Sequence, residues 1–306
     1  MKTIQFSKTK NKIIVLVVAV LLLLAASQWW TIKMIYAQKL KGDTALFFAK
    51  AYRLTAGRAV GPNEQLTIYL SDLLQDQVFA QDYIKKESAA EKNPVNFSDQ
   101  DIKDMVWKKV LKQAWIDHLA KKDKITLQDQ DLEDFYKGVG GLDTLKDGLK
   151  SANINFEQYQ NFVVKPSVME AKVYKSLLDN FNDLAGMQKA QNAYKALVDD
   201  KKPFADVAAE FSDDKTYIDS SMFVRDDELG EFGEPIKNLK PGEYSKIMVM
   251  PGNPGYYVIW LLKGVAPDPE TKQEVKELRG IAVQAKSMDE FYQEWQNSVK
   301  ISQWYK

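Results

Sequence analysis

This sequence is poor in histidine and cysteine, the side chains that most often carry out acid–base, nucleophilic or metal chemistry at neutral pH. Its 306 residues include one histidine, His118, and no cysteine. Thiol catalysis, disulfides and a lipid-modified cysteine are therefore excluded, and a single histidine does not predict a zinc site. His118 falls near the end of an apolar-faced helix, where a partly buried histidine close to the helix dipole is the simplest interpretation. We expect no metal ion and no cofactor.

The other polar patterns also have simple structural explanations. The acidic run from Gln128 to Asp134 lacks the glycine turn and the terminal glutamate of an EF-hand loop, so it is interpreted as a solvated helix start. The segment 138–141 (GVGG) is typical of a helix end and does not match a phosphate-binding loop. The 42 basic and 42 acidic residues balance, so no nucleic-acid partner is expected.

One region carries a functional pattern. Between residues 202 and 264 the chain contains PFADVAAEFSDD, DELGEFG, LKPGEYSKIMVM and GYYVIWLLKG, in that order. This order resembles a parvulin-type (PpiC) peptidyl-prolyl isomerase, or rotamase, domain. The closing strand of that family reads G-Y-H-I-I, so Tyr257 stands where the family has a histidine.

The resemblance implies an apolar proline slot beside two histidines, which together would lower the ~18–20 kcal/mol barrier to amide rotation. This chain departs from the pattern at three places. No R-H-I-L strand occurs between residues 175 and 188, Tyr257 cannot restore a histidine pair, and only GEPIKN separates Phe232 from Leu239, where the family has its pocket helix. We therefore expect a domain without isomerase activity and assign no catalytic residue.

Four residues near these motifs are the candidate substrate-binding residues. The methionines among them are flexible and suit varied apolar ligands. The candidates are Tyr257, Met248, Met250 and Phe232.

The preceding block, residues 110–174, resembles the N-terminal chaperone domain of the SurA, PpiD and PrsA families. Positions that match the family pattern are Ala120, Ile125, Leu127, Asp129, Leu132, Ile154, Phe156 and Tyr159. In the SurA and PpiD families the C-terminal segment returns to the chaperone domain. By the same resemblance, Ile301, Trp304 and Tyr305 are expected to dock there.

The N-terminal segment predicts a membrane helix. Lysines 2, 8, 10 and 12 precede an uncharged run from Ile13 to Ile32, which is long enough to cross a core of ~30 Å. Trp29 and Trp30 suit a membrane interface at its far end. A cleaved signal peptide, with Ala25-Ala26-Ser27 as the cleavage site, is the alternative. With a retained anchor, the protein is expected to be a single-pass protein of the cell membrane, with its bulk outside the cytoplasm, periplasmic or on the cell surface.

We expect an α+β fold with a mainly helical chaperone domain and a small α/β domain containing an antiparallel sheet. Helices are predicted at 33–55, 66–86, 98–122, from 126 to about 138, from 155, and at 167–181, 188–198, 203–211 and from 287. Strands are predicted at 244–250, 256–262 and 278–284, and a loop at 56–65. Strand 278–284 is expected to replace the missing first strand of the isomerase sheet, beside the 244–262 hairpin. The expected boundaries are a basic cytoplasmic tail 1–12, an anchor 13–32, a chaperone domain 33–182, a parvulin-like domain 183–266 and a returning C-terminal strand and helix 267–306.

These patterns favour a membrane-tethered chaperone that holds unfolded or newly secreted polypeptides in a groove between its two domains. Two alternatives remain at this point. One is an active prolyl isomerase with an altered pocket, and the other is a module that binds one dedicated protein partner near the membrane.

Overall fold

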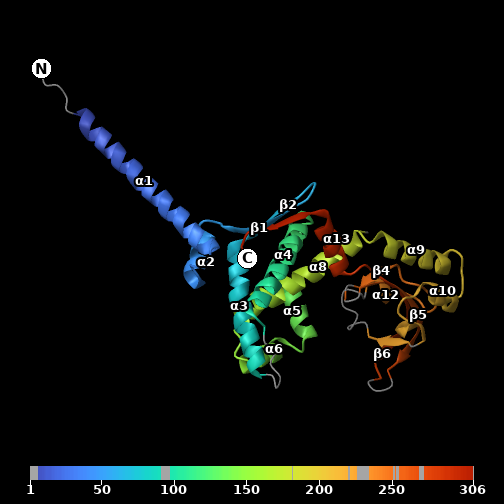
Figure 1. The fold of residues 1–306 in the computed structure, drawn as a ribbon. Helices are drawn as coiled ribbons and strands as arrows, with labels where there is room; N and C mark the ends of the chain where they lie inside the picture. The colour runs from blue at the N-terminus through green and yellow to red at the C-terminus, as the bar shows by residue number, and fades with distance from the viewer. Residues whose placement is uncertain are drawn as a thin grey trace. The chain divides into compact units, whose positions relative to one another are not determined.

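The computed structural model describes residues 6–90, 97–180, 182–219, 221–225, 234–250, 252, 255–268 and 272–305. The chain divides into two compact units, and each contains one antiparallel sheet (Figure 1). The first unit comprises Met1–His118, Glu133–Val164 and Ser298–Lys306, and the second comprises Leu119–Leu132 and Lys165–Asn297. The expected α+β class is therefore found, with strands in both units.

The first unit is built from long helices around a small three-stranded sheet. Its elements are α1 (Phe6–Tyr36), α2 (Gly42–Ala51), β1 (Thr55–Val60), β2 (Gln65–Tyr69), α3 (Leu70–Ala90), α4 (Asp99–Lys122), α5 (Asp129–Gly138), α6 (Leu142–Ser151), α7 (Phe156–Tyr159), the π-helical turn η1 (Gln160–Val164) and β7 (Lys300–Gln303). The boundary between the units falls within α4 and again within α5.

The structure contradicts the predicted membrane helix. In the described part of the chain, no helix is both long enough and apolar enough to span a bilayer. The predicted anchor over 13–32, and the cell-membrane location inferred from it, are therefore wrong.

The α4 helix begins as the sequence predicts. Ser98 and Asp101 form a reciprocal capping box: the Asp101 backbone N–H donates to Ser98 Oγ at 3.1 Å, and the Ser98 N–H donates to Asp101 Oδ2 at 3.0 Å. These bonds satisfy backbone groups that have no partner within the helix. The same device precedes α13 (Met288–Ser298), where Ser287 and Glu290 exchange the equivalent bonds.

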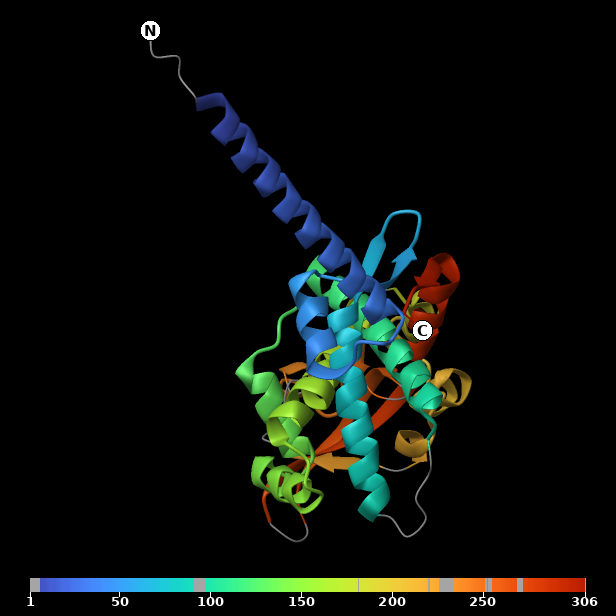
Figure 2. The same ribbon diagram turned by 60° about the vertical axis from the view of Figure 1, so that its left-hand side comes forward.

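Residues 55–69 differ from the prediction. The expected loop at 56–65 and the first residues of the expected helix at 66–86 form a β1–β2 hairpin, seen in pale blue in Figure 2. β1 is the central strand of the sheet order β2-β1-β7. At Gly57 a Cβ atom would collide with the Ser302 carbonyl and the Trp107 ring, so the close approach of β7 requires glycine there.

The C-terminal segment docks on the first unit through this sheet. β7 pairs antiparallel with β1, with Ala59 opposite Ile301. Tyr305 is buried, and Trp304 is half-exposed with Arg58 5.4 Å from its ring centroid. The segment that contains Ile301, Trp304 and Tyr305 therefore lies in the first unit, where its strand pairs with β1.

The second unit places a four-stranded sheet between helices and short segments. Its elements are α8 (Lys165–Asp179), α9 (Leu184–Val198), α10 (Phe204–Phe211), α11 (Thr216–Asp219), β3 (Met222–Val224), α12 (Glu234–Lys237), β4 (Met248–Met250), β5 (Tyr256–Pro267), β6 (Glu274–Gln284) and α13. The strand order is β3-β6-β5-β4, all antiparallel. β6 pairs with β5 along its length, so the prediction that 278–284 lies beside the hairpin is confirmed.

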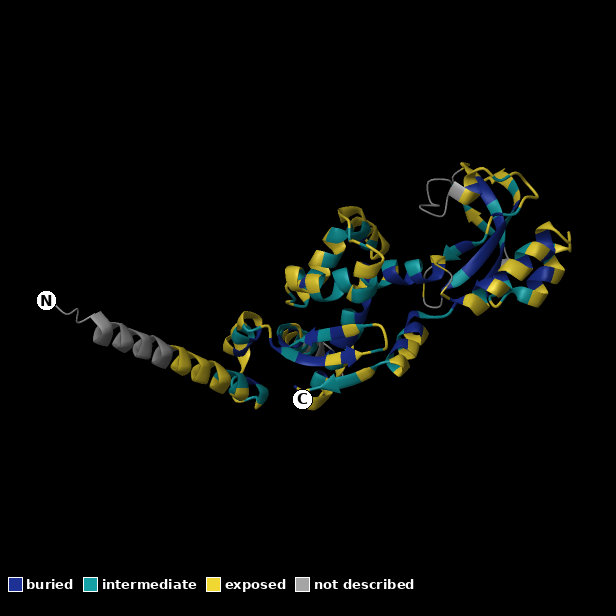
Figure 3. Cartoon of the chain, turned by 90° about the horizontal axis from the view of Figure 1, so that it is seen from above, coloured by how far each residue is buried: buried dark blue, intermediate teal, exposed yellow. Residues whose placement is uncertain are grey.

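Much of β5 and most of β6 are buried, drawn dark blue in Figure 3, and the two faces of this sheet bury different side chains. Val258, Trp260 and Leu262 pack with Ile236 of α12 on one face. Because side chains alternate along a strand, Tyr257 and Ile259 lie on the other face, toward α9. Both faces are covered, which explains the nearly continuous apolar run of β5.

Candidate functional site

The first unit contains an open pocket of about 550 Å³. Its walls come from the α1–α2 link, the start of α2, the first half of α3, the start of α4 and the α7–η1 segment, with Tyr305 behind them. The volume lies within the ~300–1,000 Å³ that is usual for ligand sites. Segments far apart in the sequence therefore meet here, which no local pattern predicts.

The apolar wall of the pocket is centred on α3. Leu74 and Val78 are one helical turn apart and share a face, and Val78 is 58% exposed. Phe79, on the flank, stacks on Phe162 with ring centroids 4.9 Å apart and planes inclined by 19°. Leu46 of α2 completes this wall. The pocket thus offers aliphatic and aromatic surface to a ligand.

Phe162 is held by an unusual backbone and by a charged pair. It lies on η1, and π-helical turns are rare and frequently occur at functional sites. Lys109 Nζ lies 5.7 Å from its ring centroid and pairs with Asp76 of α3. Burial raises the pKa of Asp76, and the charge of Lys109 partly opposes that shift. The pair fixes α3 against α4 behind the aromatic wall.

Glutamine amides line the rest of the pocket. Gln75, Gln77 and Gln81 come from α3, and Gln158 comes from α7. Among the residues that the structure describes, none of these four side chains has a hydrogen-bond partner. Each offers two donors and an acceptor oxygen. Sequence analysis missed this set, because glutamines beside an apolar helical stripe look like ordinary surface residues.

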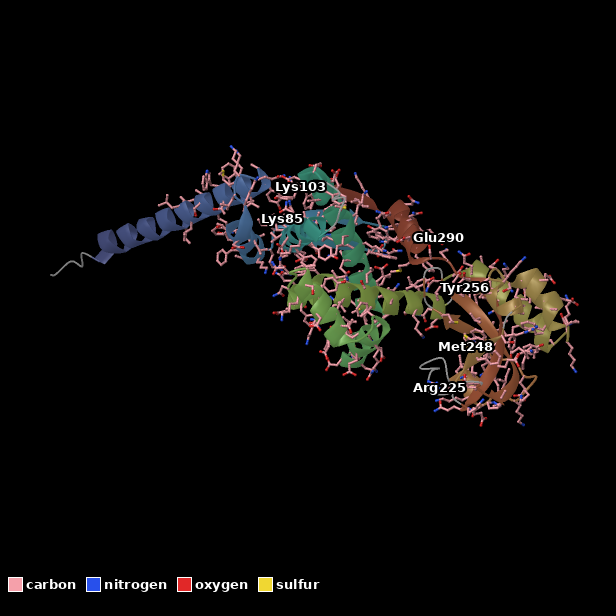
Figure 4. All side chains as sticks on the ribbon, turned by 90° about the horizontal axis from the view of Figure 1, so that it is seen from below. Lys85, Lys103, Arg225, Met248, Tyr256 and Glu290 are labelled. Carbon is pink, nitrogen blue, oxygen red and sulfur yellow. The ribbon has the colours of Figure 1, made fainter. Side chains whose placement is uncertain are left out.

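The charges at the rim cancel. Lys41 and Lys103 are balanced by Asp43 and Asp99. Lys103, labelled in Figure 4, donates from Nζ to Gln38 Oε1 at 2.7 Å. The pocket therefore has no net charge to attract a charged ligand.

Tyr257, the residue at the family's histidine position, is fully buried in the second unit. Its side chain is 0% exposed, and its hydroxyl has no hydrogen-bond partner among the described residues. A Cβ at Gly186, in the first turn of α9, would lie 3.0 Å from the Tyr257 ring. Burial, followed by the nearby Asp183 carboxylate, raises the pKa of Tyr257 well above its usual value. A phenol in this position stays neutral and cannot contact a peptide at the surface.

The polar groups around Tyr257 have structural roles. Asp183 Oδ1 caps α9 by accepting from the Gly186 N–H at 3.1 Å, and its Oδ2 accepts from the Lys286 N–H at 2.8 Å. Tyr174 donates to the Lys286 carbonyl at 3.0 Å, and burial raises its pKa to about 12. These bonds tie α8, α9 and the end of β6 together.

Three of the four predicted substrate-binding residues are described, and Tyr257 lies apart from Met248 and Met250. Met248 and Met250 lie with Tyr256 on the sheet face opposite Tyr257, because Met250 pairs with Tyr256 and Val249 pairs with Tyr257. Met248 and Tyr256 are labelled in Figure 4. Met248 is buried in that face and is part of its core. Phe232 lies outside the described residues.

His118 also has a structural role. Its Nε2 lies 3.2 Å from Glu64 Oε2, and about a third of its side chain is exposed. Glu64 belongs to the β1–β2 turn, so this contact joins the hairpin to the end of α4. Within the described ranges, no group of three or more histidine, cysteine, aspartate or glutamate side chains could hold a metal ion.

The parvulin-like and SurA-like resemblances rest on sequence motifs alone, and the chemistry of the pocket is what the structure adds. No family model, no curated protein and no solved structure matches the chain.

Proposed function

We propose that this protein is a folding chaperone that binds unfolded polypeptides and does not catalyse prolyl isomerisation. The observation that carries the proposal is the neutral, open pocket of the first unit, which combines apolar surface with unpaired amides. Unfolded chains expose apolar side chains and peptide groups together, and this pocket offers partners for both kinds of group.

Apolar side chains in and next to the pocket are accessible. Phe47 of α2 is 65% exposed, and Val78 of α3 is 58% exposed. Exposed large apolar residues that gather around a concave site are typical of protein-binding surfaces. The SurA-like order of motifs in residues 110–174 supports the same function.

The isomerase alternative is less favoured by the geometry. Tyr257 is buried beneath α9, and the Met248 and Met250 side chains lie on the opposite face of the sheet. Catalysis of isomerisation requires groups that contact the twisted amide more strongly than the ground state.

Aggregation of several chemically denatured proteins of unrelated sequence, followed by light scattering, tests the proposal. The wild-type chain should suppress aggregation of most of them. Val78→Lys places a charge in the pocket and should weaken suppression. Val139→Lys, at an exposed position outside the pocket, is the matched control and should not.

A prolyl-peptide isomerisation assay completes the test. Rates at background are expected for the wild-type chain. Suppression of none of the clients would reject the chaperone proposal, and suppression of a single client would favour a module for one dedicated partner. Isomerase rates well above background would favour the enzyme.

A further inference from the structure

The four glutamines of the pocket have hydrogen-bonding capacity that the described fold leaves unused. Polar groups beside an apolar pocket are normally satisfied by protein, by water or by a ligand. A glutamine amide can donate to a carbonyl and accept from an N–H, which are the two groups of every peptide unit except one that precedes proline. The set is therefore matched to backbone and not to a particular side chain.

The spacing of Gln77 and Gln81 fits an extended chain. They lie four residues apart on α3, so their Cα atoms are separated by about 6 Å along the helix axis. In an extended strand, residues that face the same side repeat every ~6.6–6.8 Å. Two successive peptide groups on one side of an extended segment can thus meet the two amides in turn.

The remaining walls define the side chains that such a segment carries. Phe162 is partly exposed and stacks on the buried Phe79, and Val78 adds aliphatic surface beside this aromatic pair. The balanced rim charges favour neither an anionic nor a cationic ligand. An uncharged segment with one apolar side chain packed against the rings therefore suits all parts of the pocket.

We infer that the pocket holds one extended, uncharged polypeptide segment, recognised through its peptide groups by the glutamine amides and through one bulky apolar side chain by the Phe79–Phe162 stack. This inference rests on the proposed chaperone function and names the kind of segment it selects. Proline has no N–H, so a proline in the bound stretch weakens binding. The pocket should therefore disfavour proline, whereas the proline slot of an isomerase binds it.

Fluorescence anisotropy with labelled heptapeptides tests the inference without altering the protein. The reference peptide is neutral with a central phenylalanine (Ser-Thr-Ala-Phe-Ala-Thr-Ser). A second peptide carries N-methyl groups on the phenylalanine and the following alanine, and a third replaces both alanines with aspartate. The second and third peptides should each bind at least several-fold more weakly than the reference. N-methylation that leaves affinity unchanged overturns recognition through the backbone.

Two variants, Gln77→Met and Gln81→Met, test the amides directly. Methionine keeps the length and the helix propensity of glutamine and increases apolar surface. Loss of one hydrogen bond should weaken binding about two- to tenfold. If apolar burial alone held the peptide, both variants would bind it equally or more tightly. Gln188→Met, at an exposed position on α9 in the other unit, is the matched control and should have no effect.

The outcomes separate this inference from the proposed function. If the wild-type chain suppresses aggregation but neither glutamine variant loses peptide affinity, the inference is refuted and the proposed chaperone function stands. A chain that binds no peptide and suppresses no aggregation refutes both. A chain that binds no peptide but forms dimers that Gln77→Met disrupts shows that a second copy occupies the pocket, which also overturns the inference.

Discussion

Replacing Tyr257 with phenylalanine should stabilise this protein. The ring is completely buried, and its hydroxyl has no partner within the described chain. A buried polar group without a hydrogen bond costs about 1–3 kcal/mol. Tyr257→Phe removes that oxygen and keeps the ring that packs near Gly186. We expect the free energy of unfolding to rise by about 1–2 kcal/mol, because deletion of one oxygen leaves only a small void.

Tyr174→Phe is the matched control for this prediction. The same atom is deleted in the same unit, but the Tyr174 hydroxyl donates to the Lys286 carbonyl. Its loss should lower the free energy of unfolding by about 1 kcal/mol. The two substitutions should therefore have opposite signs.

Urea denaturation and calorimetry measure both effects. For units of 150–250 residues, each kcal/mol shifts Tm by about 2–4 °C. A Tyr257→Phe variant that unfolds more easily than wild type would show that the hydroxyl has a bonding partner, and the account of a neutral, inaccessible phenol would fail. Prolyl isomerisation that disappears in Tyr257→Phe would refute the non-catalytic proposal as well.

Four further substitutions test other parts of the fold. Gly57→Ala should lower the free energy of unfolding by at least about 1–3 kcal/mol, because its Cβ collides with the Ser302 carbonyl. Gly148→Ala, with no atom within 4 Å, should raise it by up to ~1 kcal/mol. Thermal melts that rank the two variants in the reverse order would contradict the β1–β7 register. Ser287→Ala should cost about 0.5–2 kcal/mol in urea titrations by removing the α13 cap, and an unchanged midpoint would show that the cap contributes nothing. Burial raises the pKa of Asp76 above 3.8. The stability that this shift contributes to the folded state is fully present below pH 3.8 and is lost as the pH rises through the raised pKa. The stability of wild type relative to Asp76→Asn should therefore increase from pH 7 to pH 4, and a decrease would contradict the assigned direction.

Local signals in the sequence predicted local structure well. The capping boxes at Ser98 and Ser287 set where α4 and α13 begin, and Asn155 caps α7 by accepting from the Gln158 N–H at 2.9 Å. Each of these bonds spans three residues, so the sequence contains both partners. The start of α5 differs from the predicted start at 126: the helix begins at Asp129, and the Gln128 N–H donates to Asp131 Oδ2 at 2.6 Å.

The β1–β2 hairpin could not be predicted in this way. TAGRAV is rich in small residues and shows no clear alternation of apolar and polar residues. β1 lies between β2 and β7 and pairs with both, and β7 lies far away in the sequence. Local propensity indicates a loop, and pairing on both edges overrides it.

The faces of the β4–β5 hairpin also depended on information outside the strands. Alternation alone places Met248 and Met250 on one face. Whether Tyr257 joins them is decided by the register, which pairs Met250 with Tyr256, and a slip of one residue would reverse the answer. The glutamine pocket was hidden for a similar reason, because its walls come from segments between residues 38 and 305.

The pairing of β7 with β1 has a consequence for biosynthesis. β7 follows β1 by about 240 residues, and the whole of α8 to α13 lies between them. At a translation rate of ~5–20 residues per second, a nascent chain waits about 12–48 s between making the two partners. During that interval one edge of β1 has no neighbour, and exposed strand edges invite incorrect association. A protein proposed to protect other chains would thus itself emerge from the ribosome with an unprotected strand.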